Sequence, residues 1–210
     1  MSEQVLRRGN VAGRSRIRTL AQIAMLGAVA TVLMLFEFPI PFLAPPFYEM
    51  DFSEVPVLIG AFAMGPMAGV AIEAIKILLN FVINGTITAG VGEIANFIFG
   101  CCFLLPAALI YRRSKTKKHA VAGMALGTVI MTVAACVVNA YVLLPAYGAA
   151  FGMPVDAFVK MGTAINGAID NLFMFALLAV APFNLLKGII VSIIVLLLYK
   201  RIRVILHGDI

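Results

Sequence analysis

Long apolar stretches separated by shorter polar segments dominate this chain. Runs such as Ile189–Leu198 lack the alternation of apolar and polar residues that barrel strands show, so they indicate helices. A helix needs about 20 residues to cross a bilayer, and a chain of this length holds about six such segments. The expected spans are Leu20–Phe36, Val55–Gly65, Met67–Ile83, Glu93–Tyr111, Ala120–Tyr147 and Pro182–Tyr199. The pattern therefore predicts an all-α membrane protein with six transmembrane helices.

Two connections between the spans differ from simple turns. Glu37–Glu54 contains four prolines, which stiffen it, and aromatic residues, which favour the membrane interface. We interpret it as an ordered cover over the spans. Gly148–Val180 mixes polar and apolar residues, and we expect part of it to be helical and to lie near the surface. No site residue is predicted within it.

The composition agrees with a membrane protein and excludes several other classes. The chain is 62% hydrophobic and 12% charged, whereas soluble domains are nearer one half and one quarter. The net charge of +6 then concerns membrane topology rather than nucleic acid. Cys101, Cys102 and Cys136 lie in apolar runs without metal-ligand spacing, and there are only two histidines. We expect no disulfide framework and no metal site.

The basic residues predict how the chain crosses the membrane. The segment up to Arg18 and the loop Arg112–His119 carry five Lys or Arg each, and the C-terminal end carries three. Six spans place all three segments on one side, which the positive-inside rule makes cytoplasmic. The predicted organisation is a cytoplasmic tail (1–18), a six-helix membrane domain (19–204) and a second cytoplasmic tail (205–210). The cover Glu37–Glu54 then faces outward.

Three polar residues near the ends of the last two spans are candidates for a binding site. At 1.5 Å per residue, Asn139 lies about 12 Å below the outer end of its span and Lys187 about 7 Å below the start of its own at Pro182. Asn184 is three residues before Lys187 and shares its helix face. A lysine within a span indicates a functional site; the alternative is that Lys187 extends to the surface without a ligand.

A second polar group lies in the third span. Glu73, Lys76 and Asn80 fall on one helical stripe, where Glu73 and Lys76 neutralise each other. We favour a structural ion pair over ligand contact here.

Together the polar residues predict a pocket open to the outside and covered by the proline-rich connection. Asparagine amides and a lysine suit a planar group with imide-like carbonyl and N–H edges, and aromatic side chains suit a flat ring. Some of these aromatic residues are equally typical of the membrane interface. The candidate substrate-binding residues are Asn139, Asn184, Lys187, Tyr48, Glu49, Asp51, Glu93, Asn96, Tyr141 and Leu143.

Five segments carry a resemblance to a known family. They are Phe36–Phe42, Asp51–Pro56, Phe62–Gly69, Asn139–Pro145 and Pro182–Gly188. In this order they resemble the riboflavin-specific substrate-binding subunits (S components) of bacterial energy-coupling factor (ECF) transporters. The likeness extends from Arg18 to Arg203, and the last two segments are the most specific.

The resemblance implies a function and a set of contacts. It implies a six-helix fold in the bacterial cell membrane that binds riboflavin under the first outer loop as cargo rather than as a cofactor. Asn139, Asn184 and Lys187 match the flavin-contacting positions of the family. Ala24 and Ala28 match the small-residue motif that contacts the transmembrane coupling subunit EcfT, which joins the S component to the ATPases EcfA and EcfA′.

Other functions have less support in the residues. The chain has no phosphate-binding loop of the ATPase type, and no Ser/His or Cys/His pair in its spans suggests an intramembrane enzyme. Internal repeats are typical of stand-alone secondary carriers, and this sequence shows no convincing repeat. An S component that binds a different vitamin is the main alternative to one that binds riboflavin.

Overall fold

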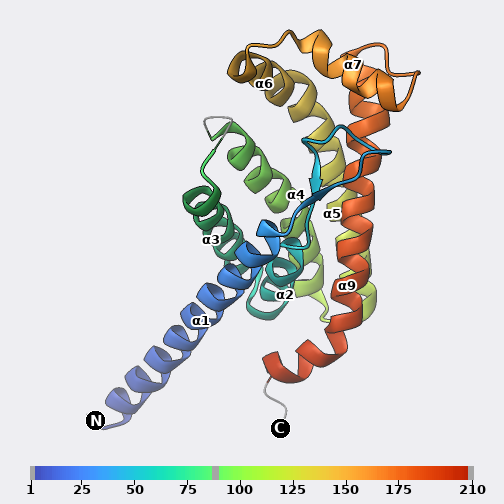
Figure 1. The fold of residues 1–210 in the computed structure, drawn as a ribbon. Coiled ribbons are helices and arrows are strands. Elements are labelled where there is room, and N and C mark those ends of the chain that lie inside the picture. The colour runs from blue at the N-terminus through green and yellow to red at the C-terminus, as the bar shows by residue number, and fades with distance from the viewer. Residues whose placement is uncertain (1–2, 87–89, 208–210) are drawn as a thin grey trace.

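The computed structural model describes residues 3–86 and 90–207, which are mostly helical. The longest helices form a bundle (Figure 1). The helices are α1 (Glu3–Leu35), α2 (Glu54–Met64), α3 (Pro66–Asn84), α4 (Val91–Arg113), α5 (Lys117–Val138), α6 (Leu144–Phe151), α7 (Val155–Ile165), α8 (Leu172–Phe175) and α9 (Ala181–His207). Two π-helical segments, η1 (Asn139–Leu143) and η2 (Ala176–Val180), join α5 to α6 and α8 to α9.

Within residues 3–86 and 90–207, five helical stretches are long and apolar enough to cross a membrane. They are Arg16–Leu35, Pro66–Asn84, Val91–Arg113, Lys117–Phe151 and Leu172–Leu198, and the shorter apolar helix Glu54–Met64 accompanies them. The chain is therefore a multi-pass membrane protein, while the count of six spans and the side on which the termini lie stay predictions. The segment predicted as an N-terminal tail is helical from Glu3 onward, as part of α1.

The last span begins earlier than the sequence predicts. We expected it to start at Pro182, but the helix is continuous from Leu172. Proline lacks an N–H and crowds the preceding turn. The π-helical segment η2 ends two residues before Pro182, and η1 ends two residues before Pro145, so a widened turn accommodates each proline. Lys187 consequently lies about 22 Å along its helix rather than about 7 Å.

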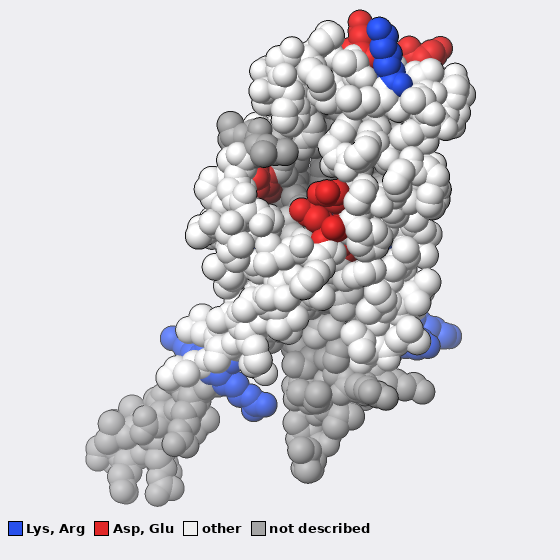
Figure 2. Space-filling model, viewed as in Figure 1, with Lys and Arg blue, Asp and Glu red and all other residues white. Residues whose placement is uncertain are grey.

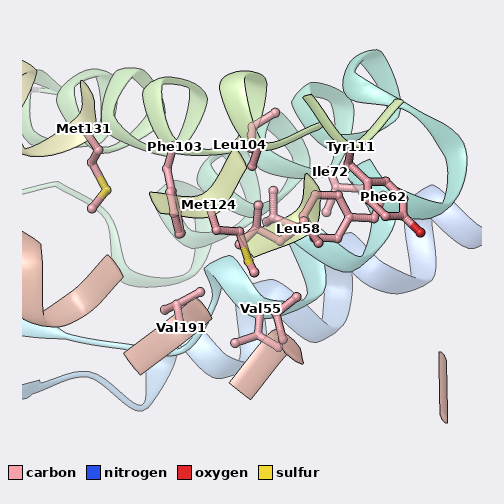
Figure 3. Packing of buried hydrophobic residues seen from close by; sticks show 14 of the residues in the cluster. Val55, Leu58, Phe62, Ile72, Phe103, Leu104, Tyr111, Met124, Met131 and Val191 are labelled. Carbon is pink, nitrogen blue, oxygen red and sulfur yellow. The ribbon is translucent and has the colours of Figure 1, made fainter. Parts of the chain in front are cut away.

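Close packing between α4 and α5 forms the centre of the bundle. A Cβ at Gly123 would lie 2.7 Å from the carbonyl oxygen of Ala107, and one at Gly127 would collide with the carbonyl oxygen of Phe103. Two glycines on one face of α5 thus let the helix backbones approach each other. Apolar side chains from α2, α3, α4, α5 and α9 complete this core, in which Phe103 and Met124 are central (Figure 3).

A short hairpin and two further helices complete the structure at one end. Strands β1 (Phe38–Pro39) and β2 (Glu49–Met50) pair antiparallel within the connection between α1 and α2. Helices α6 and α7 lie beyond this hairpin, at the end of the bundle opposite to the start of α1 and the end of α9 (Figure 1). The connection therefore lies across the bundle, not at its tip, and covers residues deep in α5 and α9.

Candidate functional site

A cavity of about 160 Å³ lies between the α1–α2 connection and helices α4, α5 and α9. Acidic side chains gather in a hollow of the surface near the centre of the molecule (Figure 2). The residues lining the cavity are Glu37, Phe47, Tyr48, Glu49, Asp51, Glu54, Gly92, Ala95, Asn96, Phe99, Gly100, Met131, Asn139, Leu143, Tyr147, Phe183, Asn184 and Lys187.

The two asparagines reach this cavity from positions in or shortly after the π-helical segments. Asn139 begins η1, and Asn184 follows η2 by four residues. Each side-chain amide donates to a backbone carbonyl one turn earlier, at 2.8 Å to Ala135 for Asn139 and at 2.9 Å to Val180 for Asn184. These bonds fix the amides in orientation, because they use the amide N–H and leave the side-chain carbonyl oxygen for another donor.

Tyr48 closes the cavity from the connecting loop. Its hydroxyl donates a hydrogen bond of 2.6 Å to Oδ1 of Asn139. Its ring lies 5.7 Å from that of Phe183 and 4.7 Å from that of Phe47, centroid to centroid. Burial of the hydroxyl raises the pKa of Tyr48 well above its ordinary value, so it stays a neutral donor.

Lys187 does not extend to the surface. It is 9% exposed, and its Nζ lies 2.7 Å from Oδ2 of Asp51. The second oxygen of Asp51 accepts from the backbone N–H of Ser53 at 2.7 Å. Burial raises the pKa of Asp51, but the ammonium groups of Lys187 and Lys76 and the hydrogen bonds from Lys187 and Ser53 outweigh burial, and the pKa is lowered to about 2. The ion pair fastens the connecting loop to α9.

Glu37 lies at the mouth of the cavity in a strongly acidic setting. Partial burial raises its pKa to about 7, assisted by the negative charges of Glu49 and Asp51 and by a hydrogen bond with Glu49. The nearby ammonium of Lys187 opposes this shift only in part. Glu37 therefore changes its charge near neutral pH.

A second buried charge cluster lies next to the cavity. Nζ of Lys76 is 2.7 Å from Oε1 of Glu73 and 2.7 Å from Oε1 of Glu54, and all three side chains are buried. The predicted pair of Glu73 and Lys76 is confirmed, and Glu54 at the start of α2 is an additional partner. Asn80, on the same stripe, accepts a hydrogen bond from Asn84 at 3.1 Å instead of joining this cluster.

The structure brings together most of the candidate substrate-binding residues. Those that line the cavity are Tyr48, Glu49, Asp51, Asn96, Asn139, Leu143, Asn184 and Lys187. Glu93 lies in an adjoining depression of about 220 Å³, which Glu49 and Asn96 also line, and accepts a hydrogen bond from Thr86. Tyr141 is 79% exposed and points away, since residues two apart on a helix lie on opposite faces. Its predicted place in the pocket is wrong.

Other cavity residues are not among the predicted substrate-binding residues, and three of them bear on the charge and shape of the site. Glu37 and Glu54 stand at the two ends of the connection that we read as a cover, and Gly100 lies in the middle of α4. The spacing of Asp51 and Glu54 around the start of an apolar helix was the available signal. The small-residue motif also has a definite place: Ala24 and Ala28 are exposed on α1, whereas Gly27 packs against Ile75 of α3.

Comparison with known proteins gives consistent matches over most of the chain. Residues 18–199 match the family model described as the substrate-specific component of the ECF transporter. The riboflavin transporter RibU of Staphylococcus aureus (strain TCH60) is 38% identical over 185 residues, covering 88% of this chain and 90% of that protein. The riboflavin transporter FmnP of Bacillus subtilis (strain 168) is 34% identical over 189 residues, covering 90% and 93%.

A solved structure is also similar. This structure is that of the S component of a bacterial ECF transporter, and it superposes on the present structure with a TM-score of 0.71 at 36% sequence identity. The match covers 90% of this chain and 96% of that chain.

Proposed function

Because the chain belongs to the family of substrate-specific components of ECF transporters, we propose that it captures riboflavin at the outer face of a bacterial cell membrane for ATP-driven import. Members of this family are transporter subunits rather than enzymes, so the flavin is cargo and not a cofactor. The relatives from S. aureus and B. subtilis are both named riboflavin transporters. The observation that carries the proposal is the convergence of Asn139, Asn184 and Lys187 on one cavity.

The chemistry of the cavity suits riboflavin. The isoalloxazine ring is flat and has an imide edge with N–H and carbonyl groups, and the amides of Asn139 and Asn184 match such an edge. The rings of Tyr48 and Phe183 provide apolar faces for stacking. The carboxylates of Glu49 and Asp51 line the same cavity and are acceptors of the kind that the hydroxyls of the ribityl chain need.

Entry of the ligand requires the connecting loop to move. Sites for small molecules usually measure about 300–1,000 Å³, and this cavity is about 160 Å³. The hydroxyl of Tyr48 already donates a hydrogen bond to the side-chain carbonyl oxygen of Asn139, and Asp51 already pairs with the ammonium of Lys187. Riboflavin therefore displaces the Tyr48 hydroxyl, and the loop closes over the bound ring.

Energy for transport comes from partner proteins in this proposal. The chain has six transmembrane segments with cytoplasmic termini, and α1 contacts the coupling subunit EcfT through Ala24 and Ala28. EcfT in turn joins it to the ATPases EcfA and EcfA′. A site for a different vitamin is the alternative, because amides and a lysine also suit other heterocycles.

The absorbance spectrum of the purified protein tests the proposal. Protein produced in riboflavin-containing medium is expected to carry a flavin spectrum, and protein freed of ligand is expected to bind riboflavin in preference to thiamine. A colourless protein that thiamine saturates and riboflavin does not would refute the choice of ligand.

A further inference from the structure

Glu54 is a cavity residue with an unused acceptor. Its side chain is buried and lines the cavity wall. Oε1 accepts a hydrogen bond of 2.7 Å from Lys76, but Oε2 has no hydrogen-bond partner within the described part of the chain. A buried acceptor without a donor is costly, so a ligand that brings a donor to this point regains that free energy.

The neighbouring carboxylate provides a natural comparison. Glu73 lies at the same distance from Nζ of Lys76 and is also fully buried, yet it does not line the cavity. Gly100 of α4, which also lines the cavity, packs against both carboxylates, because a Cβ there would collide with the Glu73 carboxylate and approach Oε1 of Glu54 to 3.2 Å. The missing side chain at Gly100 therefore leaves room for the two carboxylates next to the cavity.

The charge of the lining restricts the ligand further. Within the described part of the chain the cavity lining includes four carboxylates, from Glu37, Glu49, Asp51 and Glu54, and the ammonium of Lys187. Asp51 pairs with Lys187 and Glu54 with the buried Lys76, so the carboxylates outnumber the ammonium groups even when Lys76 is included. A hydroxyl is an uncharged donor and suits this surface, whereas a phosphate ester brings negative charge into it and is repelled.

We propose that Oε2 of Glu54 accepts a hydrogen bond from a hydroxyl of the ribityl chain and that Glu54 thereby selects riboflavin against its 5′-phosphate. The inference rests on the proposed function and names a specificity residue for that same site. Lys76 holds the carboxylate in place, and Glu73 serves only to hold Lys76.

Equilibrium binding of three flavins to four purified proteins tests this inference. The ligands are riboflavin, lumiflavin, which has the same ring without the hydroxylated chain, and riboflavin 5′-phosphate. The proteins are the wild type, Glu54→Gln, Glu54→Asp and the control Glu73→Gln, each checked for a folded state by thermal unfolding.

We expect Glu54→Gln to weaken riboflavin binding about tenfold, the loss of a charge-assisted hydrogen bond, and to leave lumiflavin binding unchanged. In the same variant, the ratio of the affinity for riboflavin to the affinity for its 5′-phosphate should fall several-fold. Glu54→Asp keeps the negative charge, but its shorter side chain moves the carboxylate oxygen away from the ligand. This variant should therefore bind riboflavin more weakly and still discriminate against the 5′-phosphate. Glu73→Gln lowers stability without changing the order of the three ligands.

Two results would overturn the inference alone. One is a Glu54→Gln protein that loses riboflavin and lumiflavin affinity equally; the other is a wild type that binds the phosphate as tightly as riboflavin. A wild-type protein that binds none of the three flavins would overturn the proposed function, and this inference with it.

Discussion

At the scale of single residues, the ion pair between Asp51 and Lys187 connects the loop to the last helix. The two residues are 136 positions apart in the chain. Breaking a buried pair on one side leaves a charge without compensation, which costs about 3–5 kcal/mol. This pair therefore contributes to both the stability of the closed loop and the shape of the cavity.

Replacing Lys187 tests this double role. Lys187→Met should lower the free energy of unfolding by about 3–5 kcal/mol, because Asp51 stays buried without its ammonium. It should also weaken flavin binding by about 1.5–3 kcal/mol through loss of a charge-assisted bond. Unfolding in detergent and flavin titration measure the two effects.

The double variant Asp51→Asn with Lys187→Met is the matched control. It removes both charges, so it should recover most of the lost stability but not the binding. If Lys187→Met alone unfolds like the wild type, the ion pair does not hold the loop.

The pKa of Glu37 predicts a dependence of stability on pH. Its folded pKa is raised from 4.5 to about 7, so the folded protein binds this proton more tightly than the unfolded chain. The stabilisation is complete below pH 4.5 and is lost as the pH rises through 7. Glu37→Gln should reduce the fall in melting temperature between pH 4.5 and pH 7.

Asp51 behaves in the opposite way and provides the comparison. Its folded pKa is about 2, so its contribution is present above its ordinary pKa of 3.8 and is lost only as the pH falls toward 2. Its own titration therefore adds no slope between pH 4.5 and 7, and replacing it should only reduce the slope due to Glu37, whose pKa the charge of Asp51 helps to raise. An unchanged slope in Glu37→Gln would refute the assignment of this proton.

Some of these residue-scale features could be read from the sequence, and others could not. An asparagine or lysine within an apolar run is visible because it breaks a pattern, and Asn139, Asn184 and Lys187 do share one cavity. The partner of Lys187 was not visible, because it depends on where a long loop folds back. Tyr141 was misplaced because closeness in sequence to a site residue does not determine which face of the helix a side chain occupies.

At the scale of whole elements, contact between α4 and α5 depends on glycine. A Cβ at position 127 would collide with the backbone carbonyl of Phe103, which cannot move aside as a side chain can. Gly127→Ala should therefore push the helices apart and cost about 1–3 kcal/mol of stability. Gly167→Ala, where a Cβ meets nothing within 4 Å, should leave the melting temperature unchanged. Equal melting temperatures for both variants would contradict this packing.

Helix α1 has two faces with different roles. Gly27 faces α3, where a Cβ would lie 2.6 Å from Ile75, and Ala24 and Ala28 are exposed on the adjoining face. Ala24→Leu with Ala28→Leu should leave flavin binding intact and abolish uptake in cells, because bulk on this face blocks close approach of a partner helix. Val133→Leu, on an exposed position of α5, is the control and should transport normally. Normal uptake by the double leucine variant would exclude this face as the coupling surface.

Helix boundaries illustrate where sequence patterns reach their limit. Apolar runs located the long helices, but Pro182 was read as a helix start because proline usually interrupts a helix. Here the wider π-helical turn η2, just before Pro182, accommodates the proline, and the helix continues through it. The same device at Asn139–Leu143 places an asparagine in the cavity, and a π-turn has no simple sequence signal.

At the scale of the whole molecule, polar groups from the loop and from two helices line one cavity in an apolar bundle. The loop contributes Tyr48 and Asp51, while α5 and α9 contribute Asn139 and Lys187, and two short contacts of 2.6 and 2.7 Å join them. The cavity that they line is bounded by the loop, and Tyr147 of α6 also contributes to its wall. We therefore expect one ligand site per chain, closed by the loop.

Titration of ligand-free protein with riboflavin, followed by quenching of flavin fluorescence, tests this claim most directly. Stacking on Tyr48 and Phe183 is expected to quench the flavin until one equivalent per chain is bound. The Asn184→Ala variant should show much weaker quenching at the same concentrations. A wild type that leaves the fluorescence unchanged, or an Asn184→Ala protein that matches it, would contradict the account.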